Sequence, residues 1–457
     1  MDQFQETLEY CQLHDLGLEW DVFTWRNHNH IAAEYIRERL VRAVANAEWM
    51  VKFPGYRVIN GDPRHSDHRP VIISTERPAG RRSSAGRGGF KFEASWLGEE
   101  KCGVVVEEAW KRAMNGQQKN AHDALKIVAG DLTGWSQNVL GDLEKRIKKI
   151  KKDLEECRRR VIGPDQVVRE GVLRFKLERL ENQVDMYWRQ RAHVRWLQER
   201  DRNTSFFHAV CKERRKRNRI RRLRKDDGSW VEGEEEKKTF IANYFLDLFR
   251  TRGDQVSQQI LNVVEAKVTE PMNDCLLKDF TADEVRRALV NIGDLKAPGP
   301  DGMSAIFYKK FWDIIGDQIV MEVLGVLNGG PVPSEWNETT IVLIPKVNRP
   351  EQVKDLRPIS LCNVLYKIVS KVLANRLKQI LPEVISPAQS AFVPGRLISD
   401  NILVAYELTH FMKQKKGKEG HAAVKLDMSK AYGRVEWPFL QAMMAKLGSE
   451  GAGLILL

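Results

Sequence analysis

The sequence lacks the features that would place a protein in a membrane or outside the cell. No run approaches the roughly 18 consecutive apolar residues of a membrane-spanning helix. The N-terminus, MDQFQETLEYCQL, has no basic stretch followed by an apolar core, which a secretory signal requires. We therefore expect an intracellular protein with no membrane partner, in either the nucleus or the cytoplasm.

Paired cysteines are also missing. The six cysteines, at positions 11, 102, 157, 211, 275 and 362, lie far apart, and none forms a Cys-x-x-Cys pair. Zinc sites and disulfide frameworks both depend on closely and regularly spaced cysteines. We therefore expect free thiols that are mostly buried.

The composition favours a large protein with a polyanionic partner. At 457 residues, with 42% hydrophobic and 30% charged residues, the chain is long enough for several structural units with their own cores. The net charge of +12 and a pI near 9.3 suit nucleic acid or an acidic membrane surface. Nucleic acid is the better match, because no membrane-binding segment accompanies the charge.

Most of the positive charge is concentrated in residues 212–225, here called the basic segment. It holds ten Lys or Arg and one Glu, which gives +9 of the net +12. Trp196, Phe206, Phe207 and Trp230 flank it, so phosphate contacts and base stacking are predicted together. The alternative is a solvated basic helix face. The candidate nucleic-acid-binding residues are Lys212, Arg214, Arg215, Lys216, Arg217, Arg219, Arg221 and Arg222.

Periodicity predicts the helices and strands around this segment. Apolar residues at 140, 143, 147, 150, 154, 157 and 161 follow a heptad pattern, and a second series runs from Leu173 to Tyr187. We expect an antiparallel coiled-coil hairpin, broken at 162–166. Buried strands are predicted at 70–75 and 339–346, a stiff turn at 298–302, and a turn leading into a helix from Arg357. The paired aspartates of KDDGSW, at 225–230, are predicted to form a turn.

The stretch VKLDMSKAYGRVEW, residues 424–437, raises the question of a metal site. Val424 and Leu426 alternate with polar residues, which predicts a short strand with one buried face that ends at Asp427. A carboxylate at the end of a strand suits a metal ion, provided that further carboxylates lie nearby.

Four motifs follow one another along the chain: LKAPGPDG at 295–302, IVLIPKVNRPEQVKDLRPISLCNVLYKIVSKVLANRL at 341–377, QSAFVPGRLISDNILVAYEL at 389–408, and the stretch at 424–437. In this order they resemble the fingers and first palm motif of reverse transcriptases from plant non-LTR (LINE-type) retrotransposons. FTWRN at 23–27 and HSDHRPVI at 65–72 resemble the C-terminal half of the apurinic-type endonuclease that precedes the polymerase in such polyproteins. FKFEASWL at 90–97 and NTSFFHAVCKERRKRN at 203–218 resemble the helical connection between them.

The resemblance implies an α+β multidomain architecture. Residues 1–76 would be the C-terminal remnant of an endonuclease α/β-sandwich, and 77–89, rich in Gly, Ser and Arg, a linker. Residues 90–265 would be a helical, coiled-coil and basic connecting region, and 266–457 the fingers and partial palm of a truncated right hand.

The same resemblance implies roles for individual residues. Asp427 would be the first metal-binding carboxylate, Tyr432 the aromatic gate under the sugar, and Lys346 and Arg357 the contacts to the triphosphate. Gln389, Gly395 and Arg396 would lie in the loop that approaches the template. Mg²⁺ is the expected cofactor, and an RNA or DNA template with primer and deoxynucleotide triphosphate are the expected partners.

The sequence departs from the family in both parts. Relatives have Asp where this chain has Gly433, and no Asp follows Asp427, so we expect the chain to stop within the palm. In the endonuclease part only Asp67 and His68 remain in a recognisable context, and Val41 replaces the Asp that orients the histidine.

Three interpretations follow. The first is an RNA-directed DNA polymerase by descent that is inactive as this chain. The second is a non-enzymatic remnant that binds RNA or single-stranded DNA through the basic segment, and the third is a working endonuclease. The interpretations differ in what they expect of the polymerase palm.

Overall fold

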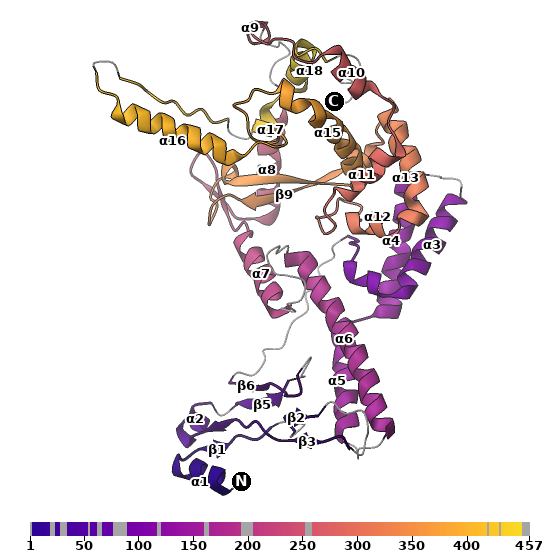
Figure 1. Cartoon of the computed structure of the whole chain (residues 1–457), viewed down its shortest axis with the longest axis vertical. Coiled ribbons are helices and arrows are strands. Elements are labelled where there is room, and N and C mark those ends of the chain that lie inside the picture. Colours follow the sequence, from indigo (N-terminus) through magenta and orange to yellow (C-terminus); the bar gives the residue numbers. More distant parts are fainter. Residues whose placement is uncertain are drawn as a thin grey trace. The chain divides into compact units, whose positions relative to one another are not determined.

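The structure is a computed structural model of the whole chain (Figure 1). It describes residues 2–18, 23–27, 34–53, 55–61, 66–75, 89–116, 120–159, 164–192, 204–251, 258–417, 420–428 and 431–449. The linker predicted at 77–89 lies, except for Gly89, outside these residues. The chain forms two compact units: a first unit of residues 1–88, 134–189 and 199–204, and a second unit of residues 89–133, 190–198 and 205–457.

The first unit begins with short helices and strands: α1 (Asp2–Tyr10), β1 (His14–Asp15), β2 (Trp25–Arg26), β3 (Arg37–Glu38), β4 (Val44–Ala45), α2 (Ala47–Lys52), β5 (Arg57–Asn60) and β6 (Val71–Ser74). The strands pair antiparallel as β1 with β4, β2 with β3, and β5 with β6. The strand predicted near residue 70 is confirmed as β6. Its predicted burial is wrong, because Ile72 and Ile73 are each 46% exposed.

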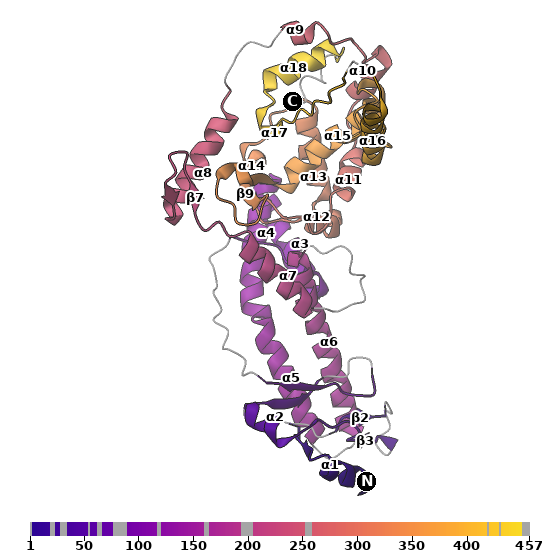
Figure 2. The ribbon, with the colours of Figure 1, turned by 90° about the vertical axis from the view of Figure 1, so that its left-hand side faces the viewer.

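A helical hairpin completes the first unit. Helices α5 (Leu143–Arg159) and α6 (Pro164–Ala192) lie side by side in both ribbon views (Figures 1 and 2). Lys151 Nζ on α5 lies 3.1 Å from a carboxylate oxygen of Glu181 on α6, and Leu154 on α5 and Leu177 and Leu180 on α6 are buried. The predicted antiparallel hairpin is therefore confirmed over the described residues. A π-helical turn, Ser136–Leu140, precedes α5, so the first apolar position of the heptad pattern lies outside that helix.

The core of the second unit is helical. Its elements are a 3₁₀ turn (Ala94–Gly98), α3 (Glu100–Met114), α4 (Ala121–Trp135), α10 (Glu270–Leu277), α11 (Ala282–Val290), α12 (Ala305–Lys310), α13 (Trp312–Leu327), α14 (Ser334–Asn337) and α15 (Val364–Val384). Val285, Ile319 and Ile368, from α11, α13 and α15, are fully buried. Phe92 packs edge-on against Phe307, with 5.2 Å between the ring centres, so the FKFEASWL segment joins this core.

Arg376 on α15 connects three of these helices. Its guanidinium donates hydrogen bonds to both carboxylate oxygens of Glu284 on α11, at 2.7 and 2.9 Å. It also donates to the carbonyl oxygens of Leu276, Lys278 and Asp279 at the end of α10, and lies 3.6 Å over the Phe280 ring. The Arg376 hydrogen bonds lower the pKa of the Glu284 carboxyl.

The other elements of the second unit are α7 (Thr204–Arg217), β7 (Leu223–Arg224), β8 (Trp230–Val231), α8 (Glu234–Phe249), α9 (Gln258–Leu261), β9 (Thr339–Pro345), β10 (Leu356–Cys362), α16 (Ile398–Gln414), α17 (Ala431–Arg434) and α18 (Trp437–Lys446). Strand β9 confirms the strand predicted at 339–346, but most of its side chains are exposed, so the predicted burial is wrong. Strand β10 replaces the predicted turn. Pro358 is compatible with it, because a proline can occupy an edge strand.

The thiols are free, as predicted, but mostly not buried. Cys102 and Cys157 are buried, whereas Cys11 is exposed and the other three are partly exposed. Burial raises the pKa of the Cys102 thiol to about 12, so this thiol stays protonated near neutral pH.

Candidate polymerase and nucleic-acid sites

The β9–β10 hairpin carries both cations that the resemblance assigns to the triphosphate. Arg357 pairs with Ile344, and the backbone N–H of Lys346 donates to the carbonyl oxygen of Asp355 over 2.7 Å. The ladder thus continues one step past β9. Because alternate residues of a strand share a face, Lys346 lies diagonally across from Arg357. Both side chains are exposed, so the structure brings them together, and their role stays a prediction.

Asp427 lies on an exposed segment rather than at the end of a strand. Residues 420–428 have no regular secondary structure, and Val424 and Leu426 are 78% and 90% exposed. The predicted strand with a buried face is therefore wrong. Alternation produces a strand only where a neighbour accepts its backbone hydrogen bonds, and no described strand pairs with this segment. Tyr432 belongs to α17, and its side chain lies outside the described part of the chain.

The described residues do not fit a polymerase metal site. Two-metal catalysis needs several oxygen ligands that converge on ions about 3.5–4 Å apart. Among the described side chains, no three from Asp, Glu, His or Cys come together in a way that could hold a metal ion. Asp427 is itself exposed. We derive no catalytic step through a metal.

Gly433, the position of a family Asp, packs closely on another helix. A Cβ added at this glycine would lie 2.8 Å from Cε1 of Phe249 on α8. The Phe249 ring is stacked on Phe245, with 5.8 Å between centres. Any side chain at position 433 therefore requires the Phe249 ring to move. Gly433→Asp would thus change the packing against α8 as well as the motif.

The loop predicted to approach the template is held together by one of its own candidate residues. Arg396 donates hydrogen bonds to the carbonyl oxygens of Pro382, Ile385, Ser386 and Gln389, at 2.6 to 3.1 Å. These contacts fasten the loop to the end of α15. Gln389 is exposed and donates to the carbonyl of Ala391, and Gly395 has a φ of +78°, which favours glycine. The geometry gives Arg396 a positioning role within the loop.

The turn at 298–302 forms as predicted, and it packs against two segments that are distant in the sequence. A Cβ at Gly299 would meet the Asn363 amide oxygen at 2.2 Å, and one at Gly302 would meet the Phe90 carbonyl oxygen at 2.0 Å. Gly302 also has a φ of +71°. Both glycines are therefore required by close approach. Asn363 accepts a hydrogen bond from the backbone N–H of Asp301 and donates to the carbonyl of Glu335.

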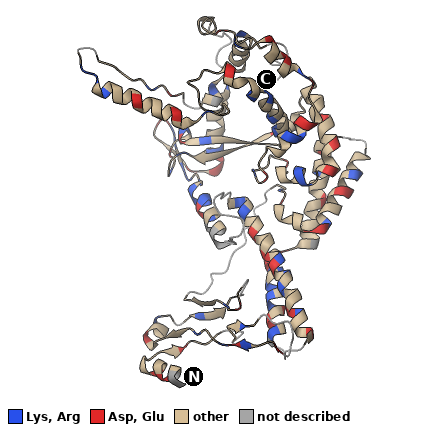
Figure 3. Cartoon of the chain, viewed as in Figure 1, with Lys and Arg blue, Asp and Glu red and all other residues tan. Residues whose placement is uncertain are grey.

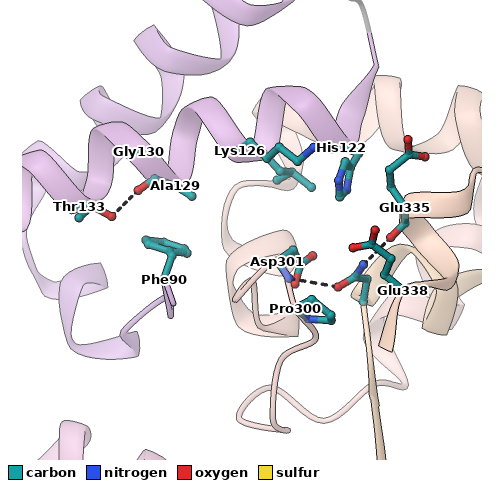
Figure 4. Close-up of a pocket in the computed structure, with 12 residues that line it drawn as sticks. Phe90, His122, Lys126, Ala129, Gly130, Thr133, Pro300, Asp301, Glu335 and Glu338 are labelled. Carbon is teal, nitrogen blue, oxygen red and sulfur yellow. Dashed lines mark hydrogen bonds between the residues drawn. The ribbon is translucent and has the colours of Figure 1, made fainter. Parts of the chain in front are cut away.

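Beside this turn lies a cavity of about 380 Å³ that sequence reasoning missed (Figure 4). His122 and Lys126 on α4 face Asp301, Glu335 and Glu338 across it. Burial raises the pKa of Asp301 to about 6 and lowers that of His122. No local signal could have found the cavity, because its walls come from separate segments between Phe90 and Asn363.

The basic segment spans the end of α7 and strand β7. Figure 3 shows basic residues, in blue, at one end of α7. Nine of its ten Lys and Arg side chains are exposed, and Arg214 is partly exposed. Phe207 is 1% exposed, so its predicted role as a flanking stacking surface is wrong, whereas Trp230 is 37% exposed. Trp196 lies outside the described residues, as does the Phe206 side chain.

The KDDGSW turn is confirmed as the connection between β7 and β8. The backbone N–H of Lys225 donates to the Ser229 carbonyl over 2.9 Å, and Asp227 Oδ1 accepts a hydrogen bond from the Ser229 N–H over 2.8 Å. Gly228 has a φ of +86°. The Asp227 carboxylate is thus part of the hydrogen bonding of this turn.

In the first unit, Asp67 is held by a tryptophan of the FTWRN motif. Its Oδ2 accepts a hydrogen bond from Trp25 Nε1 over 2.8 Å, and this bond lowers the pKa of the Asp67 carboxyl. His68 is exposed, and its backbone N–H donates to Ser66 Oγ. Val41, which the resemblance places where relatives have the orienting Asp, donates its backbone N–H to Thr24 Oγ1. The endonuclease role of Asp67 and His68 stays a prediction.

Comparison with known proteins supports the polymerase part of the resemblance. Residues 344–452 match the family described as reverse transcriptase (RNA-dependent DNA polymerase). The match begins in β9 and includes Lys346, Arg357 and Asp427. Over this segment the chain is similar to reverse transcriptases.

Three curated proteins that are similar to the chain come from transposons or mobile elements. It is 29% identical over 369 residues to the transposon TX1 uncharacterized 149 kDa protein of Xenopus laevis, which covers 77% of this chain and 27% of the relative. It is 25% identical to the probable RNA-directed DNA polymerase from transposon BS of Drosophila melanogaster, over 49% of this chain and 25% of the relative. Identity to the RNA-directed DNA polymerase from mobile element jockey of the same species is 26%, over 48% of this chain and 24% of that protein. The chain thus spans about a quarter of the length of these relatives.

None of the described helices is both long and apolar enough to span a membrane.

Proposed function

We propose that the chain is the fingers and first palm motif of an RNA-directed DNA polymerase by descent, and that it does not extend a primer by itself. The observation that carries the first part is the placement of Lys346 and Arg357 on one face at one end of the β9–β10 hairpin. Two exposed cations at this spacing suit the charge of a triphosphate. The observation that carries the second is the exposed Asp427, with no described carboxylate cluster around it.

The surface around Asp427 supports a place in a larger palm. Helix α16 has no buried side chain, and Ile402, Leu403, Tyr406 and Phe411 are each at least 60% exposed. So many large apolar side chains exposed on one helix are typical of an interface. We infer that α16 and residues 420–428 pack within the palm of a complete polymerase, where the segment around Asp427 gains strand neighbours.

A chimera tests the triphosphate role. The remaining palm and thumb of the jockey relative are placed after Leu457, and primer extension is measured on an RNA template. Lys346→Gln and Arg357→Gln should each raise the KM for deoxynucleotide triphosphate about tenfold or more, because a charged contact is lost. Lys354→Gln, an exposed lysine of the same hairpin, is the matched control. An equal effect at all three positions would contradict the proposal.

A second function has its own supporting observation. The exposed cations of the basic segment support binding of RNA or single-stranded DNA without catalysis. The buried Leu223 of this segment packs in one cluster with Phe245, Val353 and Leu356, which anchors the cations to the hairpin that carries Arg357. Fluorescence anisotropy with labelled oligonucleotides tests it. Binding that ignores substitutions in the segment would contradict it.

A further inference from the structure

The outer face of the β7–β8 hairpin combines arginine and tryptophan. Leu223 pairs with Val231, and Arg224 pairs with Trp230. Leu223 and Val231 are buried, at 0% and 3% exposure. Because side chains alternate along a strand, the positions flanking Leu223 and the partner Trp230 lie on the opposite, outward face.

On that face, an arginine and a tryptophan are already stacked. The guanidinium carbon of Arg222 lies 4.0 Å from the centre of the Trp230 ring, and the Arg222 side chain is exposed. A planar guanidinium stacks on an aromatic ring with one face and leaves its other face to solvent. The tight turn between β7 and β8 and the buried Leu223–Val231 pair fix the two side chains relative to each other.

We propose that Arg222 and Trp230 form a stacking platform for one unpaired base, with Arg221 and Arg224 beside it to contact the phosphates on either side. The inference rests on the proposed nucleic-acid binding by the basic segment and adds a preference for unpaired bases. A base in a duplex already stacks on its neighbours, so its face is not available to the platform. An unpaired base offers that face whatever its identity.

Two substitutions separate stacking from charge. Arg222→Lys keeps the positive charge and removes the planar group, whereas Arg286→Lys makes the same change at an exposed arginine of α11, outside the basic segment. Trp230→Leu keeps an apolar side chain on the hairpin and removes the aromatic ring. Thermal unfolding of each variant shows whether the second unit retains its stability.

The experiment measures the affinity of the full chain for a labelled 20-nucleotide single strand and for the 20-base-pair duplex of the same sequence. Trp230→Leu and Arg222→Lys should weaken single-strand binding roughly five- to hundredfold, with duplex binding changed less than twofold. Arg286→Lys should leave both unchanged. Equal losses for single strand and duplex, or no loss for either variant, would overturn the platform.

The two proposals fail in different ways. If the wild-type chain binds neither probe, or if its binding shows no salt dependence, the proposed nucleic-acid function is wrong. If binding depends on salt but Trp230→Leu and Arg222→Lys bind the single strand as wild type does, the platform alone is wrong. A photoreactive 5-iodouridine strand gives an independent readout, because it should crosslink to the peptide that contains Trp230. Crosslinking elsewhere only would count against the platform.

Discussion

Replacing four cations of the basic segment with glutamine should flatten the salt dependence of nucleic-acid binding. Arg214, Arg215, Lys216 and Arg217 occupy the last turn of α7, and all but the partly exposed Arg214 are exposed. Each phosphate neutralised on a single strand contributes about 0.7 to the slope of log K against log salt. If all four contact phosphates, the slope falls by about 2.8. When the salt concentration rises from 50 to 200 mM, the variant should therefore lose about fiftyfold less affinity than the wild type does.

A matched variant separates local contacts from net charge. Glutamine at the exposed lysines 145, 148, 149 and 152 of α5 removes the same four positive charges from the +12 of the chain. Fluorescence anisotropy of a labelled single strand, titrated at several salt concentrations, gives the slope for each protein. Circular dichroism checks that α7 persists, since cations near a helix C-terminus stabilise it. Equal slopes for the two variants would refute the reasoning, because the effect would then come from net charge.

Three further predictions concern stability and the endonuclease part. Arg376→Met should lower the free energy of unfolding by about 3–5 kcal/mol in urea titrations, because Glu284 loses its buried partner. The control, Lys378→Met on the exposed side of α15, should change the free energy of unfolding by less than about 1 kcal/mol. Similar losses for the two variants would contradict the stabilising role of the Arg376 contacts. The pKa of Asp301 rises from 3.8 to about 6, so ionisation costs the folded state up to about 3 kcal/mol at pH 7.5. Asp301→Asn should therefore stabilise the protein at pH 7.5, and the gain should shrink as the pH falls through 6 towards 4; a gain independent of pH would refute this. Plasmid nicking with Mg²⁺ or Mn²⁺ should not exceed that of His68→Ala, since Asp67 is engaged by Trp25; activity above this control would sink the prediction.

Local sequence patterns predicted the helices better than the strands. The apolar spacing between residues 143 and 157 needs only a partner at similar spacing, and α6 follows directly in the chain, so the hairpin could be predicted. Strand β10 was missed because a proline at position 358 locally favours a turn. The pairing of Pro358 with Leu343 on β9 depends on tertiary structure, which a local pattern does not contain. Alternation at Val424 and Leu426 misled for the reverse reason: no described strand pairs with it.

The candidate site follows the same rule. In the sequence, Lys346 and Arg357 belong to one motif, at 341–377. In the structure, the register between β9 and β10 places them on one face of the hairpin. The sequence held no signal for the four carbonyl acceptors of Arg396 or for the Phe249 ring against Gly433, because both are contacts across segments. The Arg222–Trp230 stack was foreshadowed only by the aromatic residues near the basic segment.

The measurement that tests the central claim most directly is primer extension by the unmodified 457-residue chain on an RNA template with a divalent metal. The proposed function predicts background product for both the wild type and Asp427→Asn, because the described carboxylates do not converge around Asp427. Product from the wild-type chain that disappears in Asp427→Asn would contradict it, since the chain would then hold a working polymerase site.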